Sequence, residues 1–207
     1  MPRLTYLKRL DSDRIWRVRE LSDLRLQFEN SVGERERNVT SRSIVVMCYA
    51  HWEGYFANCV HIFLDYLEAL NLTYGALPMD FFLGACSPAF NQYRDKVDNS
   101  KSRLALIHAI NAVNKTPFKG FDRKVLLPRS NLNFERLEFI FSMVGLSLAP
   151  FQPYRIKLDK ELVAWRHQVA HGQMFTLDIA RVISHTKFSE ELMFSVREAF
   201  EDALHMY

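Results

Sequence analysis

Residues 165–172, with the sequence Trp-Arg-His-Gln-Val-Ala-His-Gly, bring one arginine and two histidines together just before a glycine. The guanidinium of Arg166 is a permanent cation whose donors match the oxygens of a phosphate. The imidazoles of His167 and His171 are the side chains most easily recruited as proton carriers near neutral pH. These residue types point to phosphodiester chemistry that needs no metal ion.

The spacing of the arginine and the second histidine is a weak signal by itself. It occurs twice, at Arg103 and His108 and again at Arg166 and His171, which is about what chance gives. The first copy lies among apolar residues, as in an ordinary amphipathic helix, whereas in the second the polar His167 follows the arginine. An ideal helix places the two histidines one turn apart on one face and the arginine well round the side. The arginine's reach, fraying of the last turn or a second subunit would be needed to bring all three to one phosphate.

Each of these residues also has an ordinary structural interpretation. Arg166 would form an ion pair on a helix surface, and His171 would occupy a helix C-terminus, where the helix dipole favours it. Two histidines four residues apart, such as His167 and His171, also provide half of a zinc site. The chain has no HExxH motif, however, and no obvious acidic or cysteine ligand close by. We therefore expect neither a metal ion nor another cofactor.

The composition is that of an ordinary globular chain. Of 207 residues, 48% are apolar and 25% are charged, which disfavours disorder, and the low glycine content disfavours a turn-rich β-fold. This length predicts a single domain over residues 1–207. Cys48, Cys59 and Cys86 have no CxxC spacing, which predicts buried free thiols in a reducing compartment. The first residues lack the apolar run of a signal peptide, and no stretch reaches the roughly 18 apolar residues of a membrane span, so we expect a cytoplasmic protein.

The basic residues are unevenly distributed. Residues 91–130 contain nine Lys or Arg against three Asp, an excess of six positive charges, whereas residues 43–90 contain no Lys or Arg. Such a segment is typical of a surface that faces a polyanion, but a solvated surface segment would look the same.

Apolar periodicity predicts an all-α bundle of four to five main helices with an irregular middle segment. The strongest signal is a largely buried central helix over residues 40–70. Ser87-Pro88 is expected to end the helical turns that precede it. In the helix over residues 100–114, one face is expected to point into the core, and it consists of Leu104, Ile107, Ile110 and Val113. The other helices are expected at residues 13–30, with Asp13 as the N-cap, and at 79–85, 100–114, about 131–144 before Gly145, 158–170 and 189–205.

The second Arg–His segment resembles the signature of the HEPN superfamily, which is an arginine, then a polar residue, then a histidine four to six residues after the arginine. Arg166, His167 and His171 match these places. Residues 42–55, which contain Trp52-Glu53-Gly54, are similar to the long second helix of stand-alone bacterial HEPN-like nucleases. The resemblance covers roughly residues 35–172 and also includes Ser130-Asn131-Leu132 and Val144-Gly145-Leu146.

The resemblance implies a metal-independent endoribonuclease that cleaves single-stranded RNA as a homodimer with a composite active site. Arg166 would hold the phosphate oxygens and His171 would move a proton, with His167 and Glu53 in supporting roles. It also implies a toxin or an anti-phage defence effector, with an antitoxin or another operon partner protein. Arg94, Lys101 and Arg103 are candidates for contacts to the RNA backbone.

One position departs from the family pattern, and other residues also fit ordinary structural roles. HEPN toxins paired with a nucleotidyltransferase antitoxin often have a tyrosine two places after the histidine, where this chain has Gln173. Trp52 also fits an ordinary core position, and Glu53 an ordinary solvated or paired carboxylate. The alternative function is a non-catalytic HEPN-like helical module that binds RNA, nucleotide or a protein partner. The remaining histidines are expected to be structural: His51, His61, His108, His185 and His205.

Overall fold

The structure, a computed structural model, describes residues 2–128 and 131–207, with the side chains of all of these except residues 83, 84, 87 and 88. Helices and turns make up this part of the chain, in which no β-strand occurs and one isolated bridge joins Thr73 to Pro117. The expected all-α class is therefore confirmed. None of the helices described combines the length and the apolar character that crossing a membrane requires.

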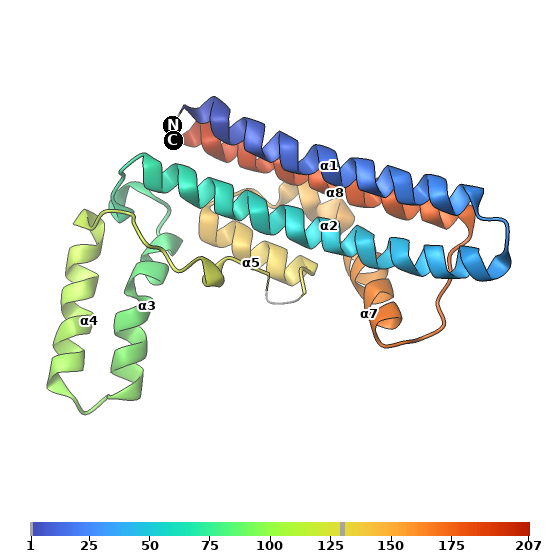
Figure 1. Cartoon of the computed structure of the whole chain (residues 1–207). Helices are drawn as coiled ribbons and strands as arrows, with labels where there is room; N and C mark the ends of the chain where they lie inside the picture. Colours follow the sequence, from blue (N-terminus) through green and yellow to red (C-terminus); the bar gives the residue numbers. More distant parts are fainter. Residues whose placement is uncertain (1, 129–130) are drawn as a thin grey trace.

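Three long helices lie side by side and form the body of the molecule (Figure 1). They are α1 (Arg3–Asn30), α2 (Glu34–Ala69) and α8 (Ile179–Met206), and each packs against the other two. Both termini lie at the same end of this layer (Figure 1).

Helix α2 is the centre of the core, as its sequence predicts. Its apolar positions at spacings of three and four are buried. Among them, the ring of Phe56 contacts three other aromatic rings, those of Trp52, Phe141 and Phe200. Burial of large aromatic side chains from α2, α5 and α8 gives the fold much of its apolar stabilisation. The predicted buried free thiols are also found, at Cys48, Cys59 and Cys86.

All three long helices begin earlier than the sequence signals indicate, and α2 starts at Glu34 where residue 40 was expected. Asp13 is not an N-cap but lies inside α1, where its carboxylate accepts hydrogen bonds from Trp16 Nε1 at 2.8 Å and Arg17 Nε at 3.1 Å. Asp178 caps α8, since its carboxylate accepts a hydrogen bond from the backbone N–H of Arg181 at 2.8 Å. The starts of α1 and α8 were misplaced because a residue type that caps helices also occurs inside them, where its side chain has another partner: Asp13 pairs with Arg17, and the buried Ser189 donates its hydroxyl proton to the carbonyl of Cys48 at 2.9 Å.

A helical hairpin projects from one end of the three-helix layer (Figure 1). It consists of α3 (Asp80–Asp95) and α4 (Ser100–Ala112), and α4 is capped by Asn99, whose side chain accepts a hydrogen bond from the backbone N–H of Lys101 at 2.9 Å. The break expected at residues 87–88 is wrong, because the backbone of α3 stays helical through them. A proline inside a helix costs about 3 kcal/mol, and α3 nevertheless continues past it and packs against α4 and α5.

The inward face predicted for α4 is also wrong. Three of the four side chains expected to face inward are largely exposed: Leu104 is 54%, Ile107 is 52% and Ile110 is 40% exposed. The fourth, Val113, is buried, and so is the polar Ser102. The hairpin stands away from the bundle (Figure 1), so α4 packs on α3 and the side chains of Leu104, Ile107 and Ile110 stay largely exposed to solvent.

The chain then returns to α2 through a series of shorter elements. Helix α5 (Phe134–Val144) starts at Asn133, whose side chain accepts a hydrogen bond from the backbone N–H of Arg136, and stops as predicted at Gly145, which has φ +71°. Ser130 lies outside the described residues, and the helix expected from about residue 131 begins at Phe134, with Asn133 as its N-cap. The connecting turns are η1 (Tyr74–Ala76), η2 (Val113–Lys115), η3 (Arg123–Val125) and η4 (Ala149–Tyr154). Turn η4 leads into a continuous helical path made of α6 (Arg155–Lys157), the π-helical turn η5 (Leu158–Val163) and α7 (Ala164–Ala170).

Candidate functional site

Helix α7 carries the Arg–His segment and lies across α2 (Figure 1). It continues the helical path of α6 and η5, and it ends at the predicted glycine. Gly172 has φ +75°, and the backbone N–H groups of Gly172 and Gln173 donate to the carbonyls of Val169 and Gln168 at 3.0 and 2.9 Å. This closing motif satisfies carbonyl groups that a helix end otherwise leaves unpaired.

The guanidinium of Arg166 is held between α2 and the segment before α5. Its Cζ atom lies 4.2 Å from the centroid of the Tyr49 ring, and its Nη2 atom donates a hydrogen bond to Asn131 Oδ1 at 3.4 Å. The first contact is a cation–π interaction, which holds the guanidinium over the face of a buried ring. Arg166 is therefore a fixed cation on the face of α2.

The hydroxyl group of Tyr49 connects this stack to its surroundings. It donates to Glu53 Oε1 at 2.9 Å and accepts from the backbone N–H of Leu132 at 2.7 Å, while Trp52 Nε1 donates to the carbonyl of Leu132 at 3.2 Å. Burial first, and then the nearby Glu53 carboxylate, raise the pKa of Tyr49 to about 12, so the phenol keeps its proton. The segment that carries Asn131 is thereby tied to α2.

The two histidines lie one turn apart at the far end of α7. The ring centroids of His167 and His171 are 6.1 Å apart and their planes differ by 10°. His171 is exposed and His167 is half-buried. Partial burial, followed by the charges of Arg166 and His171, lowers the pKa of His167, so at neutral pH it is an uncharged imidazole that can accept a proton.

Arg166 and His171 do not meet within one chain. Five residues of helix separate them by about 140° of rotation and about 7.5 Å along the axis. Arg166 contacts Tyr49 and Asn131, whereas the side chain of His171 faces solvent. The angular separation expected from the sequence is therefore present in the structure.

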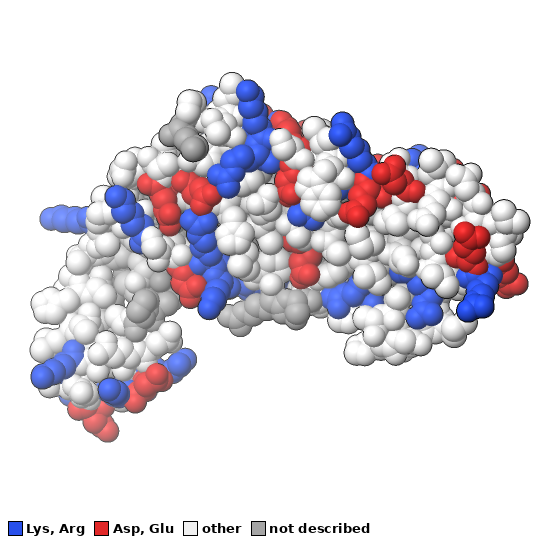
Figure 2. Space-filling view, in the orientation of Figure 1, with Lys and Arg blue, Asp and Glu red and all other residues white. Residues whose placement is uncertain are grey.

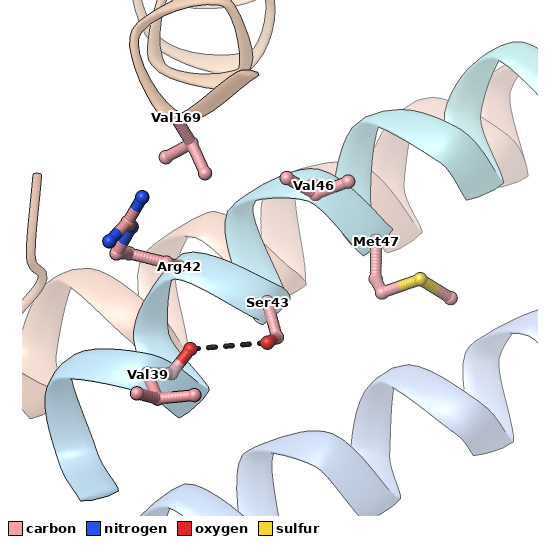
Figure 3. Close-up of a pocket in the computed structure, with 6 residues that line it drawn as sticks. All are labelled: Val39, Arg42, Ser43, Val46, Met47 and Val169. Carbon is pink, nitrogen blue, oxygen red and sulfur yellow. Dashed lines mark hydrogen bonds between the residues drawn. The ribbon is translucent and has the colours of Figure 1, made fainter. Parts of the chain in front are cut away.

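A shallow groove runs beside this site where α7 crosses the first half of α2 (Figure 3). It has a volume of about 410 Å³, and Arg42 extends along it toward Val169 (Figure 3). The lining residues are Val39, Arg42, Ser43, Val46, Met47 and Val169.

The basic residues proposed for RNA contacts are not near α7. Arg94, Lys101 and Arg103 belong to the α3–α4 hairpin, which projects from the layer away from α7 (Figure 1). Arg94 pairs with Asp95 at 3.3 Å, and Arg123, from the same basic segment, pairs with Asp65 at 2.7 Å. Over the face in Figure 2, Lys and Arg are interspersed with Asp and Glu and form no single basic patch.

Sequence reasoning did not identify three residues that the structure places in or beside the site. They are Tyr49, Asn131 and Arg42, which the sequence shows only as members of residues 42–55 and 130–132, the segments that resemble the HEPN superfamily. Tyr49 and Glu53 are four residues apart on a helix, the spacing at which side chains meet, so this pair was the one available signal. Within the described part of the chain, no three His, Cys, Asp or Glu side chains gather closely enough to hold a metal ion.

Comparison with known proteins identifies the class of helical bundle. The family model described as HEPN_MAE_28990:/-like HEPN matches residues 6–207. The chain therefore belongs to the HEPN superfamily and, within it, to the HEPN_MAE_28990-like family. No curated protein and no solved structure was found to match the chain.

Proposed function

We propose that this HEPN protein is a metal-independent endoribonuclease that cleaves single-stranded RNA by attack of the RNA's own 2′-hydroxyl group. The observation that carries the proposal is the arrangement of α7, in which an arginine fixed on Tyr49 is followed by two stacked histidines at the exposed end. Membership of the superfamily supports it, since HEPN domains are often ribonucleases.

In this mechanism the ribose 2′-oxygen attacks the adjacent phosphorus while His171 accepts the 2′-hydroxyl proton, an effect typically worth about 10²–10⁴ in rate. Arg166 stabilises the charge that builds on the non-bridging oxygens. The bond to the 5′-oxygen breaks and that oxygen takes up a proton, which leaves a 2′,3′-cyclic phosphate and a 5′-hydroxyl. The neutral His167 orients the phosphate or shares the proton transfer. DNA is not cleaved because it has no 2′-hydroxyl group.

The active unit that we propose is a homodimer. Because Arg166 and His171 point to different sides of α7, one chain does not present both to one phosphate. A two-fold axis beside α7 would bring Arg166 of one subunit to His171 of the partner subunit. In this proposal residues 1–207 form one HEPN-like domain that acts in the cytoplasm as a toxin or anti-phage defence effector, restrained by an antitoxin or operon partner.

A second candidate is a non-catalytic helical module that binds RNA, nucleotide or a protein. The bonds that hold Arg166 favour it, because an arginine that stacks on Tyr49 and binds Asn131 also ties α7 to α2 and to the start of α5. In that case the segment would be a structural joint and the histidines an exposed helix end.

A cleavage assay in EDTA on single-stranded RNA distinguishes the two candidates. Wild type is compared with Arg166→Ala and His171→Ala, and the products are tested for a 2′,3′-cyclic phosphate end. We expect cleavage by the wild type and a loss of about 10²–10⁴ in each variant. Equal cleavage by all three proteins would reject these catalytic roles, absence of cleavage in all three would favour the binding module, and loss of cleavage through EDTA alone would restore a metal mechanism.

A further inference from the structure

One face of α2 runs from the Arg166 stack into the groove of Figure 3. Arg42, Val46, Tyr49 and Glu53 are spaced by four, three and four residues, so they lie on the same side of the helix. Helix α7 crosses this face, with Arg166 over Tyr49 and, three residues later, Val169 at the wall of the groove beside Val46 (Figure 3). The groove therefore lies on the same face of α2 as Tyr49, the ring that holds the proposed catalytic arginine.

Arg42 is the charged group of this groove. In residues 2–128 and 131–207, no ion pair and no side-chain hydrogen bond involves its guanidinium, although it is only partly exposed. Figure 3 shows it directed along the groove toward Val169. None of the residues that line the groove is acidic. An arginine held beside apolar walls without a carboxylate partner is suited to an anion supplied by a ligand.

The rest of the lining is apolar and open. Val39 and Val46 are 60% and 36% exposed, and Met47 and Val169 close the sides. Ser43 donates its hydroxyl proton to the carbonyl of Val39 at 3.1 Å, so its oxygen faces the groove mainly as an acceptor (Figure 3). The surface thus combines a flat apolar floor, one acceptor and one cation, which matches the face, the edge donors and the phosphate of a nucleotide.

We propose that this groove is a subsite for one nucleotide of the RNA, next to the phosphate that Arg166 holds. The base packs on the valine floor, and Arg42 binds the backbone phosphate of that nucleotide. Arg42 and Tyr49 are seven residues apart, about 10 Å along the axis of α2, so the two arginines contact different phosphates of one strand. This inference rests on the proposed function for its ligand, but it is tested by binding and not by cleavage.

The first test measures the affinity of a fluorescein-labelled 15-nucleotide oligouridylate for the full-length His171→Ala protein, with and without Arg42→Gln. We expect Arg42→Gln to weaken binding about tenfold at 0.1 M salt, the loss typical of one charge-assisted phosphate contact. The slope of log Kd against log salt concentration should decrease by about 0.7, the value expected for the loss of one phosphate contact to a single strand. Arg42→Lys should keep that slope, because a lysine preserves the charge. Arg19→Gln, which removes an exposed arginine of α1 outside the groove, should leave the affinity unchanged.

A second test addresses the apolar floor. We expect Val46→Ser to weaken binding of the oligouridylate severalfold and to leave unchanged the binding of an oligomer of the same length with abasic sugars. Unchanged affinity in Arg42→Gln, or an equal loss in Arg19→Gln, would overturn the subsite. So would a change in the sedimentation coefficient of Arg42→Gln in the absence of RNA, because the groove would then belong to a contact between subunits. If the binding results hold but the wild type does not cleave, the subsite stands and the ribonuclease proposal fails.

Discussion

Arg166 Cζ lies 4.2 Å from the centroid of the Tyr49 ring, and the hydroxyl group of the same tyrosine accepts a hydrogen bond from the backbone N–H of Leu132. One buried side chain of α2 thus fixes both the cation on α7 and the segment that precedes α5. A cation–π contact of this kind contributes about 0.5–2 kcal/mol. In an electrostatic mechanism, a cation that is already oriented needs no further reorganisation when charge develops on the phosphate.

The ring and the hydroxyl of Tyr49 can be separated by substitution. Tyr49→Phe keeps the ring under Arg166 but leaves the N–H of Leu132 without its acceptor, so the free energy of unfolding should fall by about 1–3 kcal/mol while kcat for RNA cleavage stays within a few fold. Tyr49→Leu removes the ring as well, and kcat should fall about tenfold or more. Urea titrations and initial rates measure the two effects. Equal kcat values for the two variants would show that the stack has no part in catalysis.

Mixing two inactive variants tests the composite site. If Arg166 of one subunit acts with His171 of the partner subunit, a heterodimer of Arg166→Ala and His171→Ala contains one intact site. Random reassociation of an equal mixture should then restore about a quarter of the wild-type rate. If each site is built within one chain, every site in the mixture lacks one residue, and the mixture should be as inactive as each variant alone.

The sequence was sufficient to predict the central helix and the fold class, because a buried helix shows its periodicity directly. Residues 40–70 carry apolar side chains at spacings of three and four, and nearly the same span is α2. The stop signals were equally informative at Gly145 and Gly172, since both have positive φ and only glycine adopts that conformation without strain.

The helix starts and the surroundings of the hairpin could not be predicted in the same way. An aspartate such as Asp13 favours an N-cap but also forms ion pairs inside a helix, and the sequence alone does not distinguish the two. The exposure of Leu104 and Ile107 depends on whether the bundle packs around α4, which is a property of the whole fold.

For the candidate site, the sequence predicted Arg166, His167 and His171 but not what holds them. Asn131 and Arg166 are separated by 35 positions along the chain, and Leu132 and Tyr49 by 83. Contacts between residues so far apart leave no local pattern of spacing or composition. They become visible only once the fold places α7 and the start of α5 on α2.

Gly172 offers a test of how a positive φ stabilises the end of α7. Its φ is +75° and a Cβ atom added to it would meet nothing within 4 Å, so Gly172→Ala would suffer backbone strain without a steric clash. The expected loss is about 1–2 kcal/mol in the free energy of unfolding. Gly33→Ala is the matched control, because Gly33 is equally open and has φ −95°, and it should be neutral or slightly stabilising. Thermal or urea unfolding of both variants measures the difference, and equal losses would contradict the role assigned to positive φ.

The exposed side of α4 predicts an unusual tolerance to polar substitution. Leu104→Ser and Ile107→Ser should each change the free energy of unfolding by less than about 0.5 kcal/mol, since both side chains are more than half exposed. Leu137→Ala in α5, where the side chain is fully buried, should cost about 2–5 kcal/mol. A loss above about 2 kcal/mol for either serine variant would show that α4 packs against something else in solution.

His185 should make the stability of the protein fall in mild acid. Its ring is fully buried, 4.9 Å from that of Trp165, and burial, with the nearby Lys157 charge, lowers its pKa to about 4. In the unfolded chain the same group titrates near pH 6.5, so between these values the unfolded state binds more protons and the native state loses stability as the pH falls. The shift corresponds to about 3 kcal/mol in total, of which about 2 kcal/mol should be lost between pH 7 and pH 5. His185→Phe keeps a ring against Trp165 and removes the titrating group, so urea titrations at the two pH values should show a smaller loss in the variant by that amount. An identical loss in both proteins would mean that the acid sensitivity arises elsewhere in the fold.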